Sequence, residues 1–453
     1  QKINIIGGVA GGASAAAHQR SLDESANIIM FEKDEYISFA NCGLPYYIGG
    51  EITDQEALTL QTPDSFKARF NVDVRNFNEV TAITPETKTV TVYNHQLQKE
   101  YQESYDKLLL SMGAKPIKPN IPGINSNKVF TLRNIPDTYA IKEYVDTHKP
   151  KHAIVVGGGF IGIEMAENLH STGINVTIVE MANQVISPID YEMACEVHQH
   201  LISKGINLVL ETELQAINEA DNKLTVTLNN QTVDTDMVIM AIGVVPETKI
   251  VKNTEIATNS RGAIIVNDKM ETSIKDIYAV GDASEIKNFV TNKASYVPLA
   301  GPANKQGRIA ADNICGFDRH YQGTQGSSIL KVFDLTVASS GINEKTAREL
   351  NLNYDKVYTY SANHAGYYPG AVNMSIKVLF DKSTGTILGA QIVGYDGVDK
   401  RMDVLAAAIR AKMTGFDLTE LELCYAPPYG SAKDPVNMAG FVIENILTDK
   451  IKQ

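Results

Sequence analysis

Two stretches of this chain repeat one pattern: a strand, a glycine-rich turn, a helix and a second strand that ends in an acidic residue. The first copy has its turn at residues 7–12 and its acidic end at Glu32, and the second has them at 157–162 and Glu180. This order is typical of the βαβ unit that binds a dinucleotide. Because the unit occurs twice with similar spacing, the sequence predicts an α/β fold with two Rossmann-like dinucleotide-binding domains.

The glycines of each turn have separate physical roles. In a dinucleotide unit the first glycine makes a tight turn, the second lets the backbone approach the pyrophosphate, and the third lets the helix pack on the strand. Gly157, Gly159 and Gly162 fit these roles, whereas the first copy has Val9 at the middle position. The residues expected to hold the two nucleotides are Gly7, Gly8, Val9, Ala10, Gly11, Gly12 and Glu32 in the first unit, and Gly157, Gly159, Phe160, Ile161, Gly162 and Glu180 in the second.

The rest of the chain is arranged around these two units. Strand-like runs end near Gly113 and Gly243, and another ends at Asp282, whose carboxylate can accept hydrogen bonds from ribose or ribityl hydroxyls. The strands expected at 328–339, 373–381 and 387–393, with helices near 344–351 and 401–413, predict an α+β third domain. The expected domains are 1–115 together with 247–322, then 116–246, and finally 323–453.

A lone cysteine, Cys42, follows the first unit within ten residues. A helix expected to start near it would lower the pKa of its thiol and favour the thiolate, which is the form that attacks a disulfide. Tyr47 stands where a CxxxxC motif would place a second thiol, so Cys42 needs an external sulfur partner. The other cysteines, Cys195, Cys315 and Cys424, are expected to be buried and inert.

Composition excludes several classes of function. The 453-residue chain has a formal net charge of −12, which argues against a nucleic-acid-binding surface. No apolar run reaches the ~18 residues of a membrane helix and no apolar leader is seen, so the cytoplasm is the expected compartment. The cysteines show no CxxC spacing, and no metal site is predicted.

The run 38–46 around Cys42 and the tail runs 364–370 and 425–429, together with the duplicated unit, resemble the two-dinucleotide flavoprotein disulfide reductases. The resemblance covers nearly the whole chain. Within that family it is greatest to the single-cysteine branch of coenzyme A (CoA) disulfide reductases and their polysulfide- and persulfide-reducing relatives. It implies FAD in the first unit, NAD(P)H in the second, and a C-terminal dimerisation domain that forms a homodimer.

The resemblance also implies roles for individual residues. Cys42 would form a Cys42–S–S–CoA intermediate, and Tyr367 and Tyr425 would reach across to the cysteine site of the other subunit. Glu180 favours NADH, because a carboxylate there accepts from a 2′-hydroxyl and repels a 2′-phosphate, with use of NADPH left open. Further cofactor contacts are expected at Lys33, Asn41, Gly113, Gly243 and Asp282, and CoA contacts at Ser14, Arg20, Ser38, Asn41, Asn304 and Lys433.

Three other functions stay open from the sequence. One is a persulfide or polysulfide reductase, although the chain ends at Gln453 without room for the rhodanese domain that some relatives carry. Another is an NADH oxidase or peroxidase that cycles Cys42 through sulfenic acid, although those relatives have a histidine where this chain has Ala10. The third is a flavin-binding redox sensor without turnover.

Overall fold

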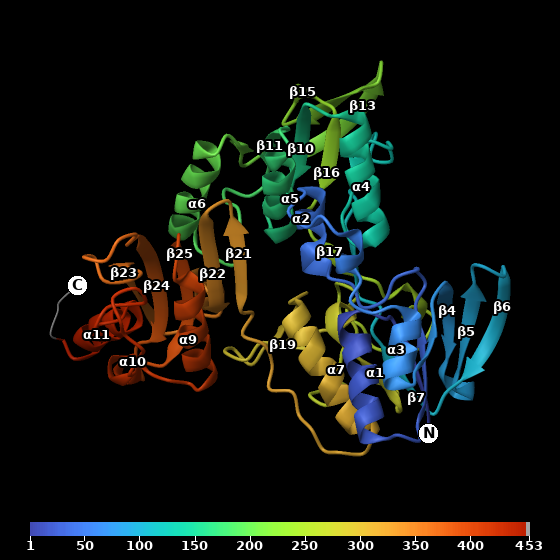
Figure 1. Cartoon of the computed structure of the whole chain (residues 1–453). Coiled ribbons are helices and arrows are strands. Elements are labelled where there is room, and N and C mark those ends of the chain that lie inside the picture. The colour runs from blue at the N-terminus through green and yellow to red at the C-terminus, as the bar shows by residue number, and fades with distance from the viewer. Residues whose placement is uncertain (450–453) are drawn as a thin grey trace.

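Each glycine-rich unit builds a parallel sheet of its own in the computed structural model, which describes residues 1–449 (Figure 1). The strand order is β18-β7-β1-β2-β3 in the first sheet and β12-β11-β10-β16-β9 in the second. The first sheet contains β1 (Lys2–Ile6), β2 (Asn27–Phe31), β3 (Asp73–Arg75), β7 (Lys107–Leu110) and β18 (Ile277–Ala279). The second contains β9 (Val129–Phe130), β10 (His152–Val156), β11 (Asn175–Val179), β12 (Asn207–Val209) and β16 (Met237–Met240).

Helices cover these sheets because the strands are apolar on both faces, as parallel strands usually are. The helices of the first lobe are α1 (Ala10–Leu22), α2 (Leu44–Ile48), α3 (Pro63–Phe70) and α7 (Ala300–Ile314), and those of the second are α4 (Ile135–His148), α5 (Phe160–Ser171) and α6 (Tyr191–Ser203). Both units need glycine at the same place. A Cβ on Gly12 or Gly162 would lie 1.9 or 2.0 Å from the carbonyl oxygen of Gly7 or Gly157.

Small antiparallel sheets extend both nucleotide lobes. They are formed by β4 (Asn78–Thr84), β5 (Thr89–Asn94) and β6 (Lys99–Ser104), and by β13 (Leu214–Ala220), β14 (Lys223–Leu228) and β15 (Gln231–Thr235). The pair β8 (Ala114–Pro116) and β17 (Val244–Pro246) carries the chain out of the first lobe and back. α7 therefore packs against α1, although the two helices lie far apart in sequence (Figure 1), and β18 pairs with β7. The expected boundaries 115/116 and 246/247 fall at this pair and stay predictions.

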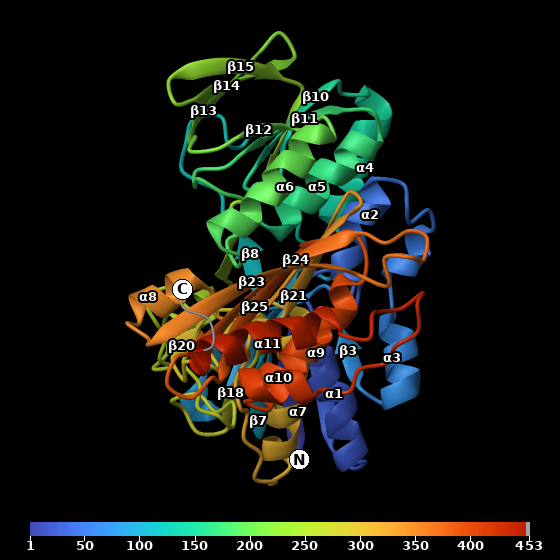
Figure 2. The ribbon, with the colours of Figure 1, turned by 90° about the vertical axis from the view of Figure 1, so that its left-hand side faces the viewer.

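The third lobe is an antiparallel sheet in the order β21-β22-β25-β24-β23 with helices packed on it (Figure 2). Its strands are β21 (Ser328–Val332), β22 (Leu335–Gly341), β23 (Tyr354–Ala362), β24 (Asn373–Asp381) and β25 (Ile387–Gly394), and its helices are α8 (Glu344–Glu349), α9 (Val398–Arg410), α10 (Gly415–Glu420) and α11 (Pro435–Leu447). The predicted single strand 328–339 is wrong: the chain reverses at Phe333, which has φ +56°, and forms a hairpin.

The predicted fold class, two dinucleotide-binding domains followed by an α+β domain, is confirmed. The third sheet also contacts α5 and α6 of the second lobe. Among residues 1–449, no helix combines the length and the apolar character that crossing a bilayer requires. Gln453, after which a rhodanese domain was considered, lies outside the described residues.

Candidate functional site

The acidic residue at the end of each unit binds back to its own glycine turn. The Glu32 carboxylate accepts hydrogen bonds from the backbone N–H groups of Gly8 at 2.9 Å and Asp34 at 3.1 Å. Glu180 accepts from Gly158 at 2.6 Å and from Ala182 at 2.9 Å. Burial raises the pKa of Glu32, and these backbone donors oppose that shift. Both acids thus lie beside the turn, where a ribose would meet them.

The helices that follow the turns have free N-termini. Their N-caps are Val9 for α1 and Gly159 for α5, neither of which makes a side-chain capping bond, and no acidic residue lies in either first turn. Such termini leave backbone N–H groups free to bind a phosphate. A Cβ on Gly159 would meet no heavy atom within 4 Å, so the space before α5 is open. Both turns fit the pyrophosphate of a dinucleotide.

Asp282 lies in a 3-10 turn directly after β18, at the carboxyl edge of the first sheet. Burial raises the pKa of its carboxyl to about 6, and the nearby Arg133 guanidinium opposes this. On α7, the Gln306 amide oxygen accepts from the Gly281 N–H at 2.9 Å, while its buried Nε2 has no partner among the described residues. A half-buried carboxyl group and an orphaned amide at one edge fit the hydroxyls and phosphates of an FAD chain.

Lys33, expected to contact a cofactor, forms an ion pair with Glu247 at 2.9 Å. Arg133 pairs with the same carboxylate and also donates to the Met112 carbonyl oxygen at 3.3 Å. Gly113 and Gly243 have φ values of +72° and +112° in the two connections that flank β8 and β17. Sequence reasoning missed Arg133, because an arginine between two units carries no motif.

Cys42 lies in a 3-10 turn, Asn41–Gly43, that leads directly into α2. The residue is exposed, yet neighbouring atoms desolvate its thiol, and burial together with the Glu164 carboxylate on α5 raises its pKa. The prediction of a lowered pKa is therefore wrong. The main reason is desolvation of the thiol, and repulsion from Glu164 adds to it, while α2 has only five residues with which to oppose these effects.

The other cysteines also differ from expectation. Cys195 and Cys315 are half-buried, and Cys424, predicted to be buried, is exposed. Cys424 sits in the loop between α10 and α11, immediately before Tyr425, where the third lobe leaves its side chains uncovered.

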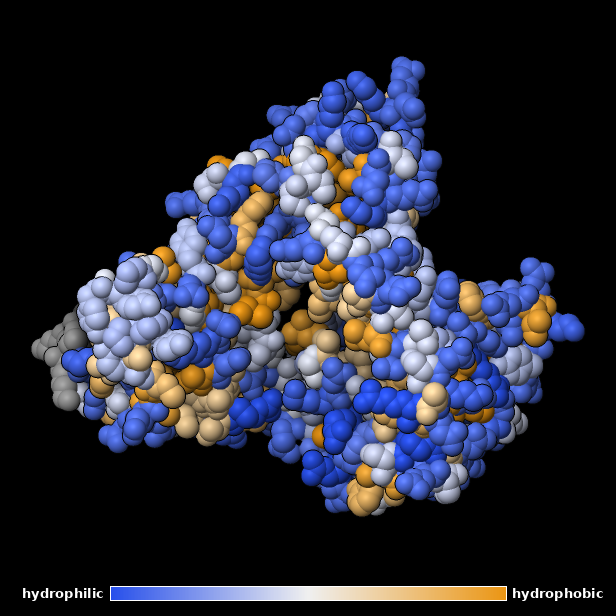
Figure 3. Space-filling model, in the orientation of Figure 1, coloured by the Kyte–Doolittle hydropathy of each residue, from blue (hydrophilic) through white to orange (hydrophobic). Residues whose placement is uncertain are grey.

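A cavity of about 430 Å³ lies between α2, α5 and the third sheet. Tyr46, one turn beyond Cys42, and Glu164 form one wall, and Lys331 and Asp396 lie among the residues of the other walls. Burial, and then repulsion from Glu167, raise the pKa of Glu164 to about 7. Figure 3 shows the hollow where the three lobes meet. The surroundings of the thiol therefore include a carboxyl group that can hold a proton near neutral pH.

Tyr367 and Tyr425 come from two loops of the third lobe, between β23 and β24 and between α10 and α11. Their hydroxyls lie 3.1 Å apart, and the side chains are 77% and 49% exposed. This hydrogen bond raises the pKa of Tyr367. Within residues 1–449 each hydroxyl bonds only to the other, so one chain does not bring the pair to its own Cys42 by any hydrogen bond.

Some of the residues expected to bind CoA come together, and one is otherwise engaged. Ser14 on α1 donates to the Asn304 side chain on α7 at 2.6 Å, whereas Lys433 is exposed in the third lobe. Ser38 has φ +46° and donates its N–H to the Gly8 carbonyl oxygen. All five N–H donors of Arg20 are used by backbone carbonyls, those of Asp23, Glu24, Ala26, Phe70 and Asn71. Arg20 thus ties the C-terminal end of α1 to the segments that follow α1 and α3. Because all its donors are engaged, it is not free to bind a phosphate.

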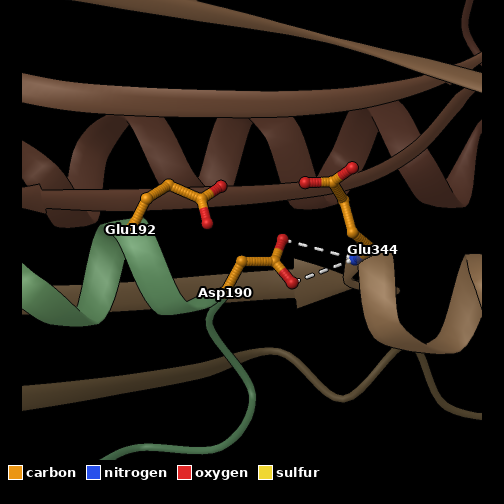
Figure 4. Close-up of side chains that lie close together, drawn as sticks. All are labelled: Asp190, Glu192 and Glu344. Carbon is orange, nitrogen blue, oxygen red and sulfur yellow. Dashed lines mark hydrogen bonds between the residues drawn. The ribbon is translucent and has the colours of Figure 1, made fainter. Parts of the chain in front are cut away.

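Three acidic side chains converge where the second and third lobes meet: Asp190, Glu192 and Glu344 (Figure 4). The fully buried Lys377 ammonium of β24 forms ion pairs with all three, at 2.8 Å to Asp190 and 2.5 Å to Glu344. Burial alone would raise the pKa of Glu344, but hydrogen bonds from Lys356, Lys377 and Tyr354 lower it to about 2. The ammonium supplies the positive charge that a metal ion would otherwise bring.

Comparison with known proteins identifies the family. Residues 1–307 match the pyridine nucleotide-disulphide oxidoreductase family, and residues 327–435 match the dimerisation domain of the same family. The chain belongs to this family. It is therefore a flavoprotein oxidoreductase that uses a pyridine nucleotide and carries a dimerisation domain.

Individual relatives agree over nearly the full length. The coenzyme A disulfide reductase of Staphylococcus haemolyticus is 40% identical over 442 residues, which are 97% of this chain and 99% of the relative. The structure of reduced Bacillus anthracis CoADR-RHD is 54% identical, with a TM-score of 0.98 over 100% of this chain and 81% of that one. The NAD-dependent persulfide reductase from A. fulgidus is 37% identical, with a TM-score of 0.96 over 100% of this chain and 84% of that one.

Proposed function

We propose that this protein reduces CoA disulfide to two CoA thiols with electrons from NADH. The observation that carries the proposal is the exposed thiol of Cys42, which has Tyr47 instead of a second cysteine on α2. A single thiol at this place can hold one half of a disulfide substrate as a mixed disulfide. Full-length similarity to proteins named coenzyme A disulfide reductase supports CoA as that half.

The two nucleotide units would hold the cofactors. FAD would lie on the α1 terminus with Glu32 and Asp282, and NADH on the α5 terminus with Glu180. When bound, FAD accepts a hydride from a nicotinamide and passes an electron pair to sulfur. The boundaries 1–115 with 247–322, 116–246 and 323–453 are proposed as the FAD, nicotinamide and dimerisation domains.

The sulfur chemistry needs one nucleophile and two reducing equivalents. The Cys42 thiolate attacks one sulfur of CoA disulfide, so the Cys42–S–S–CoA bond forms and the CoA–CoA bond breaks. The released CoA thiolate takes a proton. Two electrons from NADH then break the mixed disulfide, which returns Cys42 and frees the second CoA. The sum is NADH, a proton and CoA disulfide giving NAD⁺ and two CoA thiols.

The tyrosine pair would complete the site from another subunit. In a homodimer, Tyr367 and Tyr425 of one chain would approach Cys42 of the partner subunit, where a hydroxyl can stabilise the departing thiolate. The exposure of the pair and the mutual bond of its hydroxyls support this arrangement. Ser14, Ser38, Asn41 and Asn304 of one chain and Lys433 of the other are the proposed CoA contacts.

The test is turnover by the FAD-loaded protein with NADH and a panel of oxidants: CoA disulfide, oxidised glutathione, hydrogen peroxide and CoA persulfide. CoA disulfide is expected to give the highest kcat/KM. Intact mass before and after dithiothreitol should show one CoA-sized adduct per chain that reduction removes. Turnover of CoA disulfide no faster than the oxygen background would refute the proposal.

Nucleotide preference gives a separate prediction. Replacing Glu180 by serine should lower the ratio of kcat/KM for NADH to that for NADPH by about 10-fold or more, because the carboxylate that repels a 2′-phosphate is removed. The corresponding change in the first unit, Glu32→Ser, is the control and should leave this ratio unchanged while weakening FAD retention. A wild-type preference for NADPH would contradict the assignment of Glu180.

The second candidate is a persulfide reductase. The TM-score of 0.96 to the NAD-dependent persulfide reductase favours this function. The chemistry is also compatible, since a single thiol such as that of Cys42 can accept a sulfane sulfur. A higher kcat/KM for CoA persulfide than for CoA disulfide in the panel would select it. The peroxidase function is disfavoured by Ala10, which lacks a histidine's proton-transfer chemistry, while slow oxidase activity stays open.

A further inference from the structure

The two loops that carry Tyr367 and Tyr425 are joined through one buried arginine. Arg401, on α9, is 2% exposed. Its Nη2 donates to the Asn363 carbonyl oxygen at 2.7 Å, at the start of the Tyr367 loop. The same nitrogen lies 3.1 Å from Asp434 Oδ2 and 3.4 Å from the Tyr429 carbonyl oxygen, in the Tyr425 loop. One guanidinium therefore reaches both loops.

Further bonds hold the loops to this anchor. The Ala365 N–H donates to the Gly430 carbonyl oxygen at 2.9 Å, which joins one loop directly to the other. Asn363 accepts from the Val372 N–H at 2.9 Å and donates to Asp396 at 2.7 Å, so both ends of the 363–372 loop are fixed. Asp434 also accepts from the Val436 N–H at 3.0 Å, which ties Arg401 to the start of α11.

The tyrosine hydroxyls have no other support. Each bonds only to the other among the described residues, and both rings are exposed, so their position depends on the backbone of the two loops. We propose that Arg401 is a positioning residue. It fixes the two loops relative to each other, so that Tyr367 and Tyr425 present their hydroxyls together to a disulfide. This inference rests on the proposed function for the role of the pair.

The test is Arg401→Lys. Lysine keeps a positive charge beside Asp434, but its ammonium lacks the planar guanidinium, whose Nη1 bonds the Gly397 carbonyl oxygen while Nη2 contacts Asn363, Tyr429 and Asp434. With CoA disulfide, kcat is expected to fall by about 10- to 100-fold, the range that a misplaced catalytic group produces. The rate with ferricyanide, which takes electrons without the thiol or the tyrosines, should stay within about twofold.

The matched control is Arg410→Lys on the same helix. The Arg410 guanidinium donates to the Gly323 carbonyl oxygen at 3.0 Å and stacks over Phe289, away from both tyrosine loops. Its replacement should change neither rate beyond about twofold. A parallel loss with ferricyanide in Arg401→Lys would show a general structural role and overturn the proposal.

A double-mutant cycle separates positioning from simple destabilisation. In a chain carrying Tyr367→Phe and Tyr425→Phe, Arg401→Lys should cause no further loss, because the groups through which it acts are gone. An additive loss would overturn the proposal. If Arg401→Lys does not fold, Asp434→Asn gives the same test, since the amide keeps the acceptor oxygen for α11 but weakens the hold on Arg401.

Amide hydrogen exchange gives a readout that needs no substrate. Peptides covering 363–372 and 425–430 should exchange faster in Arg401→Lys than in the wild type, while peptides of the nucleotide lobes should not change. Unchanged exchange in both loops would refute the positioning role even if the CoA proposal holds. Conversely, a wild type without CoA disulfide turnover but with the expected exchange would refute only the proposed substrate.

Discussion

Replacing Cys42 by serine is expected to lower kcat for CoA disulfide by at least about 10⁴-fold, the scale seen when a covalent nucleophile is removed. A serine hydroxyl is not ionised near neutral pH and cannot form a disulfide with a CoA half. The ferricyanide rate with NADH should stay close to that of the wild type, because it needs only the nucleotide units. The measurement is steady-state turnover with both oxidants on the FAD-loaded protein.

Cys424→Ser is the matched control for this experiment. Cys424 is the other exposed thiol of the chain's described part, and serine is close to it in size. Its replacement should leave turnover within about twofold and leave the CoA adduct in place. Persistence of the adduct in Cys42→Ser, or its loss in Cys424→Ser, would show that Cys42 is not the thiol that holds CoA.

Replacing Lys377 by methionine is expected to lower the free energy of unfolding by about 3–5 kcal/mol. Lys377 is completely buried, and its removal leaves the buried carboxylates of Asp190 and Glu344 without their main counter-charge. The Asp190–Glu344 backbone bond remains, but it cannot neutralise two carboxylates. Urea unfolding of the FAD-loaded protein, followed by circular dichroism and flavin fluorescence, measures the loss.

Lys356→Met provides the comparison. Lys356 lies 2.7 Å from the same Glu344 carboxylate but is partly exposed to solvent, where ion pairs contribute at most about 1 kcal/mol. An equal decrease in the free energy of unfolding for the two variants would show that burial of Lys377 has no special effect. A Lys377→Met protein as stable as the wild type would mean that the acids take up protons at no penalty.

The same cluster predicts how stability depends on pH. The pKa of Glu344 is lowered from 4.5 to about 2 in the folded chain, so the folded state binds fewer protons than the unfolded state between these values. Its contribution is complete above about pH 4.5 and is lost as the pH falls toward 2. In Lys377→Met the stability lost on acidification should be smaller than in the wild type. An equal loss in both proteins would contradict the conclusion that Lys377 helps to lower the pKa of Glu344.

The sequence predicted the features that depend on local spacing. The turns at 7–12 and 157–162 and their acids at Glu32 and Glu180 lie where expected, because glycine geometry and strand length determine them locally. The hairpin at Phe333 was missed because its turn contains neither glycine nor proline. Features set by distant neighbours were not predictable. The pKa of Cys42 is raised by burial and then by Glu164, which lies far along the chain.

Two arginines also show that contacts between distant segments could not be predicted from the sequence. Arg20 was expected to contact CoA, and Arg401 was noted only as the first residue of an expected helix near 401–413. The structure uses both to bind backbone carbonyl oxygens in other segments. A helical pattern tells which residues share a face, but it does not tell which loop ends will meet that face.

The bond between each terminal acid and its glycine turn limits how such a protein can be redesigned. Glu180 both faces the expected ribose and accepts the Gly158 and Ala182 N–H groups. A change that makes room for a 2′-phosphate therefore also removes the acceptor of the Gly158 N–H, in the turn that shapes the pyrophosphate site, and the acceptor of the Ala182 N–H, just after β11. Evolution toward NADPH would need a compensating residue that satisfies those amides. A substitution at Glu180 is thus expected to change the cofactor preference and the rigidity of the turn at the same time.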